Sequence, residues 1–339
     1  MPSRPRHDNI FVDERRIENP AENPTRPTAN RSLKPTCRRP QSYGRHPITS
    51  LESFPIGCWQ GPFAAAETSR AIGSLEGGKV LYLPNLAFTA EEGCGELISA
   101  RLADQKAKNI SYDPRSRTVK GALDADRDRP RLQTLMGSFA AAATRLVTDL
   151  LPQYAGAIEC ARASYRTVEI AGREYSCLKD DKLLHVDAFP STPTRGRRIL
   201  RLFSNINPKG QPRVWHIGEP FALFAEKLLP AVSPPRASAA YLLAVLGVTR
   251  GRRSAYDQLM LDLHNQAKRD AAFQATAPYE ECAFPAGSSW MCFTDQVVHA
   301  ALAGQHALEQ TFYLDIEAMA APESSPLRIL ERMTKRALR

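Results

Sequence analysis

The spacing of apolar residues along this chain changes from a helical period to a strand period. Within residues 130–150, apolar side chains recur every three or four positions, which predicts one long helix ending before Pro152; they are Leu132, Leu135, Phe139, Ala143, Leu146 and Leu150. Upstream, residues 78–84 predict a short strand. Thr89 is expected to begin another helix, because acidic residues follow it in what would be the first turn.

After residue 152 the chain has the pattern of short strands. We expect strands at 163–170, 183–189, 199–206, 290–293 and 310–314, with a helical insertion near 255–277. Helices followed by many short strands are typical of a β-sandwich or barrel. The prediction is therefore an α+β fold with a mainly β core, a double-stranded β-helix of the jelly-roll or cupin-like type, braced by the N-terminal helices.

Composition divides the chain into three segments. Residues 1–47 contain eight of the 26 prolines and almost no apolar periodicity, which predicts a disordered basic extension. An alternative of comparable weight is translation from a start codon upstream of the true one. Residues 48–322 are expected to form the globular domain, and residues 323–339 a basic C-terminal tail or helix.

The net charge of +9 and a pI near 9.3 favour an anionic partner, such as nucleic acid, a membrane surface or a phosphorylated substrate. Residues 1–50 contribute +5 of that charge, from ten Lys and Arg against five Asp and Glu. Helix-turn-helix and aromatic–basic RNA motifs are missing, which argues against nucleic acid. The longest apolar run, 237–248, is shorter than the roughly 20 residues that a bilayer span needs. Seven cysteines without a C-x-x-C pair indicate reduced cytosolic thiols.

The strongest chemical signal is the tripeptide His-Val-Asp at residues 185–187. In a strand, side chains two residues apart share a face, so His185 and Asp187 are expected to point together, with Val186 turned aside. One imidazole and one carboxylate are two of the three ligands of a 2-His-1-carboxylate triad, which holds Fe(II) and leaves adjacent positions open. The competing interpretation is a core histidine beside an aspartate that caps a turn.

A second histidine would complete the triad. His299 lies 112 residues after Asp187, behind a tight turn, a buried strand and a short polar break. That separation suits facing strands of a jelly-roll, so His299 is the predicted third ligand. His306, in a Gly-Gln-His-Ala turn, is the main alternative, whereas His264 on the helical insertion and His216 in a β context compete poorly.

Longer blocks around these residues resemble one enzyme family. Residues 184–201 (LHVDAFPSTPTRGRRILR), 205–208 (NINP) and 304–312 (GQHALEQTF) are similar to the signature blocks of the Kdo hydroxylases, a bacterial branch of the Fe(II)/2-oxoglutarate-dependent dioxygenases. The resemblance extends over roughly residues 75–318. It implies an iron, 2-oxoglutarate and O2 chemistry, with stimulation by ascorbate left open, and catalytic and metal-binding roles for His185, Asp187 and His299.

The resemblance also implies a substrate and a location. The reaction would be hydroxylation at C3 of 3-deoxy-D-manno-oct-2-ulosonic acid (Kdo) in a Kdo-bearing lipid A glycolipid, which gives the sugar Ko. The protein is then expected in the cytoplasm, with peripheral contact at the inner membrane left open. The alternative is a 2-oxoglutarate oxygenase that acts on a protein side chain or a small metabolite.

The distal carboxylate of 2-oxoglutarate needs a buried cation, and many relatives place an arginine some ten residues after the second histidine. This chain has no base there, so Arg201, on the strand after Asp187, is the predicted replacement. Alternation puts Asn205 on the same strand face, and Gln310 is a weaker candidate for the same pocket. Arg198 should point the opposite way, as a solvated arginine.

Two further groups have a structural and a functional interpretation. One is a set of arginines, expected to be mostly solvated surface, with phosphate recognition as the weaker alternative; its members are Arg195, Arg197, Arg198, Arg250, Arg252 and Arg253. The other is Trp215 and Trp290, which are expected in the core rather than as sugar-stacking platforms.

Overall fold

The computed structural model describes residues 37–38, 50–90, 97–98, 102, 109–123, 125–232 and 253–339. Residues Leu33–Arg339 form one compact unit. Apart from Cys37 and Arg38, the predicted extension lies outside the described residues, as do residues 91–96 of the helix expected from Thr89 and the apolar run 237–248.

Two facing β-sheets organise this unit. The larger has the strand order β2-β3-β10-β7-β12-β6-β4-β5, with the bounds Leu51–Ser53, Val80–Leu83, Ser289–Phe293, Arg198–Asn205, Ala307–Leu314, Ile158–Arg166, Ile110–Asp113 and Thr118–Lys120. The smaller has the order β1-β9-β8-β11, with the bounds Cys37–Arg38, Tyr279–Phe284, Arg213–Gly218 and His299–Ala303. Among the described strands, all pairings are antiparallel except that of β2 with β3.

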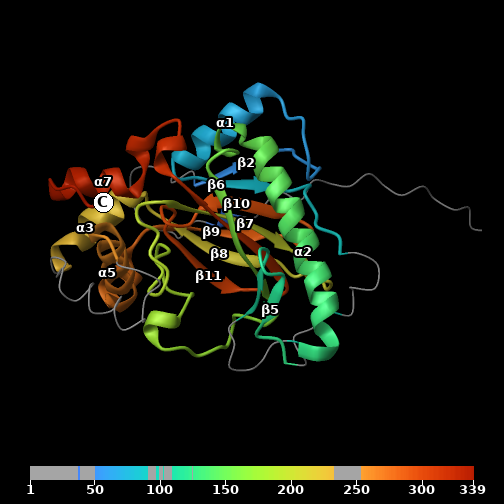
Figure 1. Ribbon diagram of the computed structural model, residues 1–339. Helices are drawn as coiled ribbons and strands as arrows, with labels where there is room; N and C mark the ends of the chain where they lie inside the picture. Colours follow the sequence, from blue (N-terminus) through green and yellow to red (C-terminus); the bar gives the residue numbers. More distant parts are fainter. Residues whose placement is uncertain are drawn as a thin grey trace, which may run out of the picture. The chain divides into compact units, whose positions relative to one another are not determined.

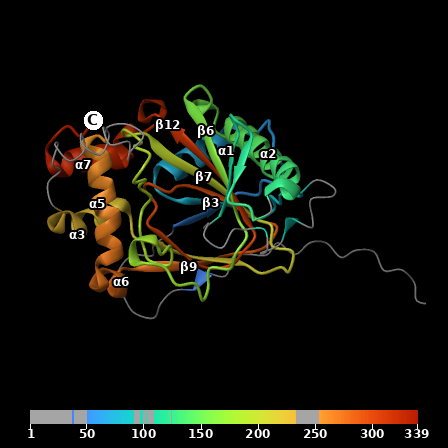
Figure 2. The same ribbon diagram turned by 60° about the horizontal axis from the view of Figure 1, so that its bottom comes forward.

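The helices lie outside the sheets (Figures 1 and 2). They are α1 (Ala65–Glu76), α2 (Ala125–Leu150), α3 (Phe221–Leu228), α5 (Ala255–Arg269), α6 (Ala271–Thr276) and α7 (Pro326–Thr334). Short 3-10 turns cover Pro152–Tyr154, Cys177–Lys179, Leu229–Ala231, Ile316–Ala318 and Pro322–Ser324. Among the described residues, no helix is long and apolar enough to cross a bilayer.

Two apolar cores hold these layers together. One joins the outer face of the larger sheet to the helices and includes Leu135 of α2, Leu202 of β7 and Leu330 of α7. The other lies between the sheets and is rich in aromatic residues, with Phe203, Trp215, Phe284 and Trp290 packed edge-on or stacked. The jelly-roll braced by N-terminal helices is therefore confirmed.

Most of the predicted elements are present. The helix expected at 130–150 is α2, which begins five residues earlier and contains Pro130. The insertion expected at 255–277 is α5 followed by α6, and the C-terminal segment contains α7, whose Leu327 and Leu330 are buried. The strand expected at 183–189 is wrong, because only His185 forms an isolated bridge, with His299, and the segment then leaves the sheet.

The expectation of a solvated Arg198 is also wrong. This side chain is 0% exposed, lies 3.9 Å above the Phe293 ring, and donates from Nε to Oδ2 of Asp295 at 2.8 Å. Its Nη2 also donates to Oε1 of Gln296 at 2.6 Å. As predicted from strand alternation, Arg198 points to the opposite face of β7 from Arg201. That outer face is not exposed to water, because α7 and the turns beside it cover it.

Asp295→Ala should lower the free energy of unfolding by about 3–5 kcal/mol, because it leaves the Arg198 guanidinium buried without its counterion. Urea denaturation followed by circular dichroism measures the change. The control is Arg328→Ala, which removes an ion pair to Glu331 whose arginine is 46% exposed, and which should cost less than about 1 kcal/mol. Equal losses in the two variants would contradict the prediction.

Candidate metal centre

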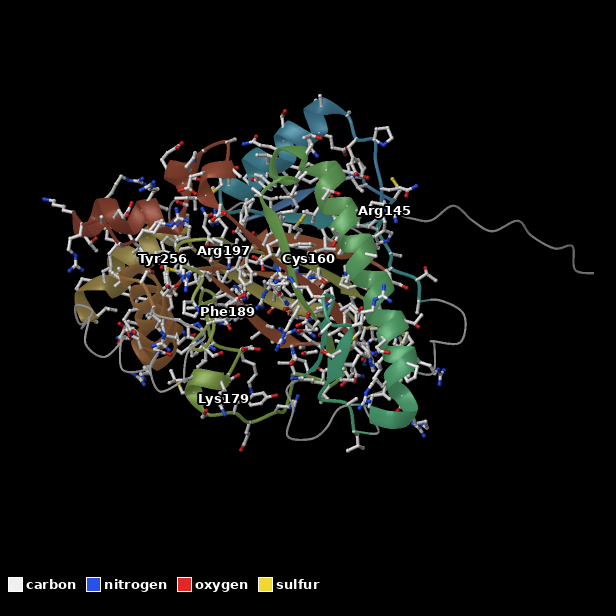
Figure 3. The ribbon with its side chains drawn as sticks, in the orientation of Figure 1. Arg145, Cys160, Lys179, Phe189, Arg197 and Tyr256 are labelled. Atoms are coloured by element: carbon white, nitrogen blue, oxygen red, sulfur yellow. The ribbon has the colours of Figure 1, made fainter. Side chains whose placement is uncertain are left out.

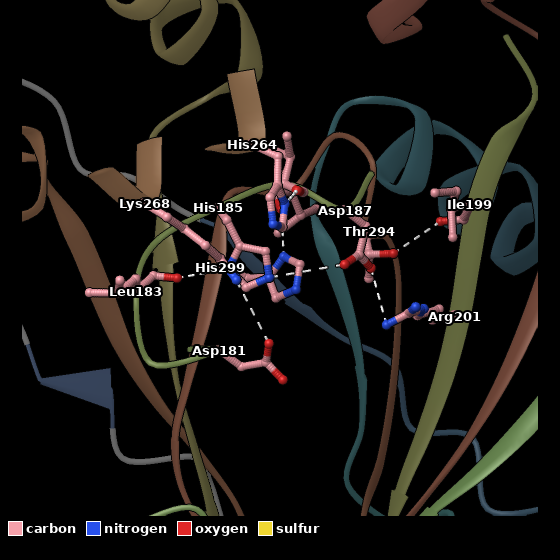
Figure 4. Close-up of polar contacts among 12 residues, drawn as sticks. Asp181, Leu183, His185, Asp187, Ile199, Arg201, His264, Lys268, Thr294 and His299 are labelled. Carbon is pink, nitrogen blue, oxygen red and sulfur yellow. Dashed lines mark hydrogen bonds and ion pairs between the residues drawn. The ribbon is translucent and has the colours of Figure 1, made fainter. Parts of the chain in front are cut away.

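Three side chains from two distant segments converge at the edge of the smaller sheet. One donor atom from each of His185, Asp187 and His299 lies within 4.8 Å of the others, a grouping that could hold a metal ion. His299 begins β11, and its backbone exchanges two hydrogen bonds with His185, at N···O distances of 2.8 and 3.0 Å. Figure 4 shows the side chains turned toward one another.

Backbone hydrogen bonds orient both imidazoles. Nδ1 of His185 lies 2.7 Å from the carbonyl oxygen of Leu183, and Nδ1 of His299 lies 2.8 Å from that of Val297. A carbonyl oxygen only accepts, so each Nδ1 carries the hydrogen and each Nε2 keeps its lone pair for a ligand. Nε2 of His185 is 4.0 Å from Oδ1 of Asp187.

Burial and neighbouring charges set the protonation of this group. Burial, followed by the adjacent His299 and Lys268, holds the pKa of His185 well below its usual value, and burial also lowers the pKa of His299. Burial alone would raise the pKa of Asp187, but Arg201 and the imidazoles more than offset it and hold that pKa below its usual range. Neutral imidazoles beside a carboxylate are the protonation states that bind a metal ion.

His264 lies beside this group, although its place on the helical insertion made it a poor candidate. A capping box of Ser254 and Asp257 begins α5, which carries His264 toward the site. Nδ1 of His264 is 2.7 Å from the carbonyl oxygen of Val186, and its ring centroid is 5.0 Å from that of His185. The insertion therefore supports Val186, which lies between His185 and Asp187 in the sequence. This contact joins residues 78 positions apart, so the periodicity of the sequence does not reveal it.

The three residues line a pocket of about 620 Å³. Trp215 forms part of its wall and stacks on the His299 ring, with centroids 5.1 Å apart and planes 21° apart. Trp215 is thus a core residue, as expected, and a pocket residue as well. The other walls include Arg166, Tyr175, Phe189, Arg201, Phe203, Arg213 and Lys268.

Arg201 lies on the pocket side of β7, where strand alternation predicts it. Its Nη1 is 3.1 Å from Oδ2 of Asp187 and 3.4 Å from Oε1 of Glu309. Arg166 donates from Nε and Nη2 to Oε2 of the same Glu309, at 2.9 and 2.7 Å. Both arginines therefore already face a carboxylate, while Nε of Arg201 stays without a hydrogen-bond partner.

Arg213, at the start of β8, is a pocket cation that the sequence interpretation missed. It is 2% exposed, its Nη1 donates to the carbonyl oxygen of Gly304 at 3.0 Å, and its Nε has no hydrogen-bond partner. Burial, then the nearby Arg166, lowers the pKa of Arg213 to about 9. Within the described residues no carboxylate forms an ion pair with it, so this buried charge favours an anionic ligand.

Asn205 and Gln310 do not line this pocket. Asn205 donates to the carbonyl oxygens of Gln211 and Phe284 and so fastens the loop after β7. Gln310 is 0% exposed and donates to the carbonyl oxygen of Ala161 on β6. Neither residue is retained as a cosubstrate ligand, because their hydrogen bonds turn them to other neighbours.

The other histidines and arginines are placed elsewhere. His306 contacts the Tyr165 hydroxyl through Nδ1 at 3.2 Å, and His216 stacks on Tyr279 at a centroid distance of 3.7 Å. Arg197 pairs with Glu159. Arg250 and Arg252 lie outside the described residues.

Known proteins are similar to this chain in sequence and in fold. Residues 59–337 match the family described as 3-deoxy-D-manno-oct-2-ulosonic acid (Kdo) hydroxylase. The chain belongs to the Kdo hydroxylase family. A crystal structure of the Kdo hydroxylase KdoO, a non-heme Fe(II) alpha-ketoglutarate-dependent dioxygenase in complex with alpha-ketoglutarate and Fe(III), is 44% identical, with a TM-score of 0.82, and the match covers 86% of this chain and 97% of that one.

Two other KdoO structures match over the same shares of both chains and at the same identity. A complex with cobalt(II) has a TM-score of 0.83, and a complex with succinate and Fe(III) has a TM-score of 0.82. A search of curated proteins found no match. The family predicted from the signature blocks is therefore confirmed.

Proposed function

We propose that this Kdo hydroxylase binds Fe(II) through His185, Asp187 and His299, and that it uses 2-oxoglutarate and O2. The observation that carries the metal assignment is the convergence of one donor atom from each of two imidazoles and one carboxylate within 4.8 Å of one another. Burial lowers the pKa of both imidazoles, which favours the neutral forms that bind a metal ion. This donor set is the facial triad of non-haem Fe(II) oxygenases. The related KdoO structures contain Fe(III) or cobalt(II).

The same pocket fits the cosubstrate. Three buried donors that line it have no hydrogen-bond partner among the described residues, namely Nε of Arg201, Nε of Arg213 and Nε1 of Trp215. Buried donors without partners favour an acceptor-rich ligand such as a dicarboxylate. We assign the distal carboxylate to Arg213, since Arg201 and Arg166 already face Asp187 and Glu309.

Each residue of the site then has its own role in the reaction. Bound iron with 2-oxoglutarate supplies the activation of O2, coupled to loss of CO2 and formation of succinate. Glu309 holds Arg166 and Arg201 in place, and the Nδ1 hydrogen bonds of His185 and His299 fix the ligand faces of both rings. Trp215 packs over His299 and excludes water from that side of the metal position.

We further propose that the hydroxylated position is C3 of Kdo in Kdo-bearing lipid A, with Ko as the product sugar. The family assignment and the signature blocks support this choice. A lipid-anchored substrate would bring the enzyme to the cytoplasmic face of the inner membrane, and the net charge of +9 favours contact with an anionic surface.

The test incubates purified protein with Fe(II), 2-oxoglutarate and Kdo-lipid A. Mass spectrometry should show a gain of one oxygen on the Kdo unit, together with succinate in equal amount. Turnover on a peptide or a small metabolite, with no oxygen gained by Kdo-lipid A, would support the alternative substrate class and contradict the Kdo proposal.

A further inference from the structure

A second cavity, of about 440 Å³, adjoins the metal pocket. The two cavities share Phe189, Pro190 and Arg201 as lining residues. Figure 3 labels three of the residues that line this second cavity, Phe189, Arg197 and Cys160. A ligand in it would therefore be next to the metal position, across the boundary formed by Phe189 and Arg201.

The cavity exists because the smaller sheet covers only part of the larger one. The aromatic core between the sheets contacts the larger sheet through Tyr82 of β3, Phe203 of β7 and Trp290 of β10. Strands β12 and β6, which continue the larger sheet beyond β7, contribute no residue to that core. On the same side they present polar residues to the cavity, among them Thr311, Tyr313 and Ser164.

Among the described arginines of this cavity, Arg162 has the longest ion pair. Arg115 and Arg197 both pair with Glu159, at 2.5 and 2.6 Å, and Arg201 pairs with Glu309. Arg162 is 45% exposed, and in the described part of the chain its ion pair is a long one, 4.0 Å to Asp113, which lines the same cavity. Its charge is therefore available to an anion that enters the cavity.

Five hydroxyl side chains line the same cavity, and the described residues give none of them a side-chain hydrogen bond; they are Ser164, Ser191, Thr192, Thr311 and Tyr313. The rings of Phe189 and Tyr313 also line the cavity, and the Arg197 guanidinium lies 4.7 Å over the Tyr313 ring. A cavity with partner-free hydroxyls, aromatic faces and one available guanidinium is complementary to a polyhydroxylated ligand that carries a negative charge.

We propose that this cavity over β6 and β12 binds an anionic sugar unit of the glycolipid, with Arg162 on its acidic group, and thereby positions the reacting carbon at the metal. The inference rests on the proposed function and adds the place where the substrate is recognised. The acidic group is a sugar carboxylate or a sugar phosphate, which present the same charge to Arg162.

Steady-state kinetics with Kdo-lipid A test the site. Arg162→Gln should raise the KM for the glycolipid about tenfold, the effect of one partly exposed charge-assisted hydrogen bond, without a matching rise in the KM for 2-oxoglutarate. Tyr313→Phe, which removes one hydroxyl, should raise the glycolipid KM by a smaller factor. The control is Arg145→Gln on α2, whose arginine is exposed and donates to Gln60 on the other side of the larger sheet.

Saturation-transfer NMR with metal-free protein gives a readout that does not need turnover. Free Kdo should receive magnetisation from the wild type and from Arg145→Gln, but not from Arg162→Gln. Glucose 1-phosphate probes the phosphate alternative, and glucose serves as the neutral reference. A glucose signal as strong as that of the charged sugars would contradict recognition of charge.

The outcomes separate the two claims. If the wild type adds no oxygen to Kdo-lipid A, the proposed function falls, and this inference falls with it. If the wild type turns over and Arg162→Gln keeps the wild-type glycolipid KM, only the inference is overturned.

Discussion

Asp187→Ala is expected to remain folded, to lose its iron, and to hydroxylate Kdo-lipid A at least about a hundredfold more slowly than the wild type. The change removes the only anionic member of the triad. Even substitutions that act through a ligand's neighbour lower metal affinity or activity by about 10–100-fold, so loss of a ligand should exceed that range. Iron content by mass spectrometry and oxygen gain on the glycolipid measure the two effects. His185→Ala and His299→Ala should behave alike.

His306→Ala is the matched control, because His306 is also a buried histidine, 5% exposed, but contacts Tyr165 instead of the triad. It should keep wild-type iron content. Iron retained by Asp187→Ala, or lost by His306→Ala in a folded protein, would contradict the assignment of the ligands. Thermal unfolding of each variant separates loss of metal from loss of fold.

Arg213→Met should raise the KM for 2-oxoglutarate about 10–100-fold and, at the same time, raise the free energy of unfolding of the cosubstrate-free protein. The first effect follows from the loss of a charged hydrogen bond, worth about 1.5–3 kcal/mol. The second follows from burial, which lowers the pKa of Arg213 to about 9 and so shows that its charged form is disfavoured in the fold. Methionine fills a similar volume without that charge. Steady-state kinetics and urea denaturation measure the two changes.

Arg201→Met provides the comparison. It removes the ion pairs to Asp187 and Glu309, so it should lower the free energy of unfolding, whatever its effect on the 2-oxoglutarate KM. If Arg213→Met raises the free energy of unfolding and Arg201→Met lowers it, then Arg213 serves ligand binding whereas Arg201 stabilises the fold. An unchanged 2-oxoglutarate KM in Arg213→Met would overturn the assignment of the distal carboxylate.

The elements that were predicted correctly have local causes. Apolar residues at helical spacing form one continuous face that must be buried, and this pattern is sufficient to predict α2 from its own sequence. The same holds for β7, where alternation put Arg201 toward the pocket and Arg198 away from it. Local pattern did not reveal that the outer face is covered, so Arg198 was wrongly expected in water.

The triad was predicted in part by local geometry. His185 and Asp187 are two residues apart, so their common direction needed only an extended backbone, even though the segment forms a single bridge rather than a strand. The choice of His299 over His306 required knowing which histidine lies opposite His185 in that bridge. Its position there depends on the pairing of β11 with β8, which brings His299 back to the site.

The sequence by itself determined the fold class, the family, and the residue types able to hold iron, because periodicity and short spacings act within a few residues. Only the tertiary structure decided how charges are shared inside the pocket. Glu309 on β12 pairs with both Arg166 and Arg201, whereas no carboxylate of the described residues forms an ion pair with Arg213 on β8. Nδ1 of His264 lies against the carbonyl oxygen of Val186, 78 positions away. Such pairings depend on distances between segments that no local pattern encodes, so the sequence could indicate the triad residues, whereas the role proposed for Arg213 depends on the tertiary structure.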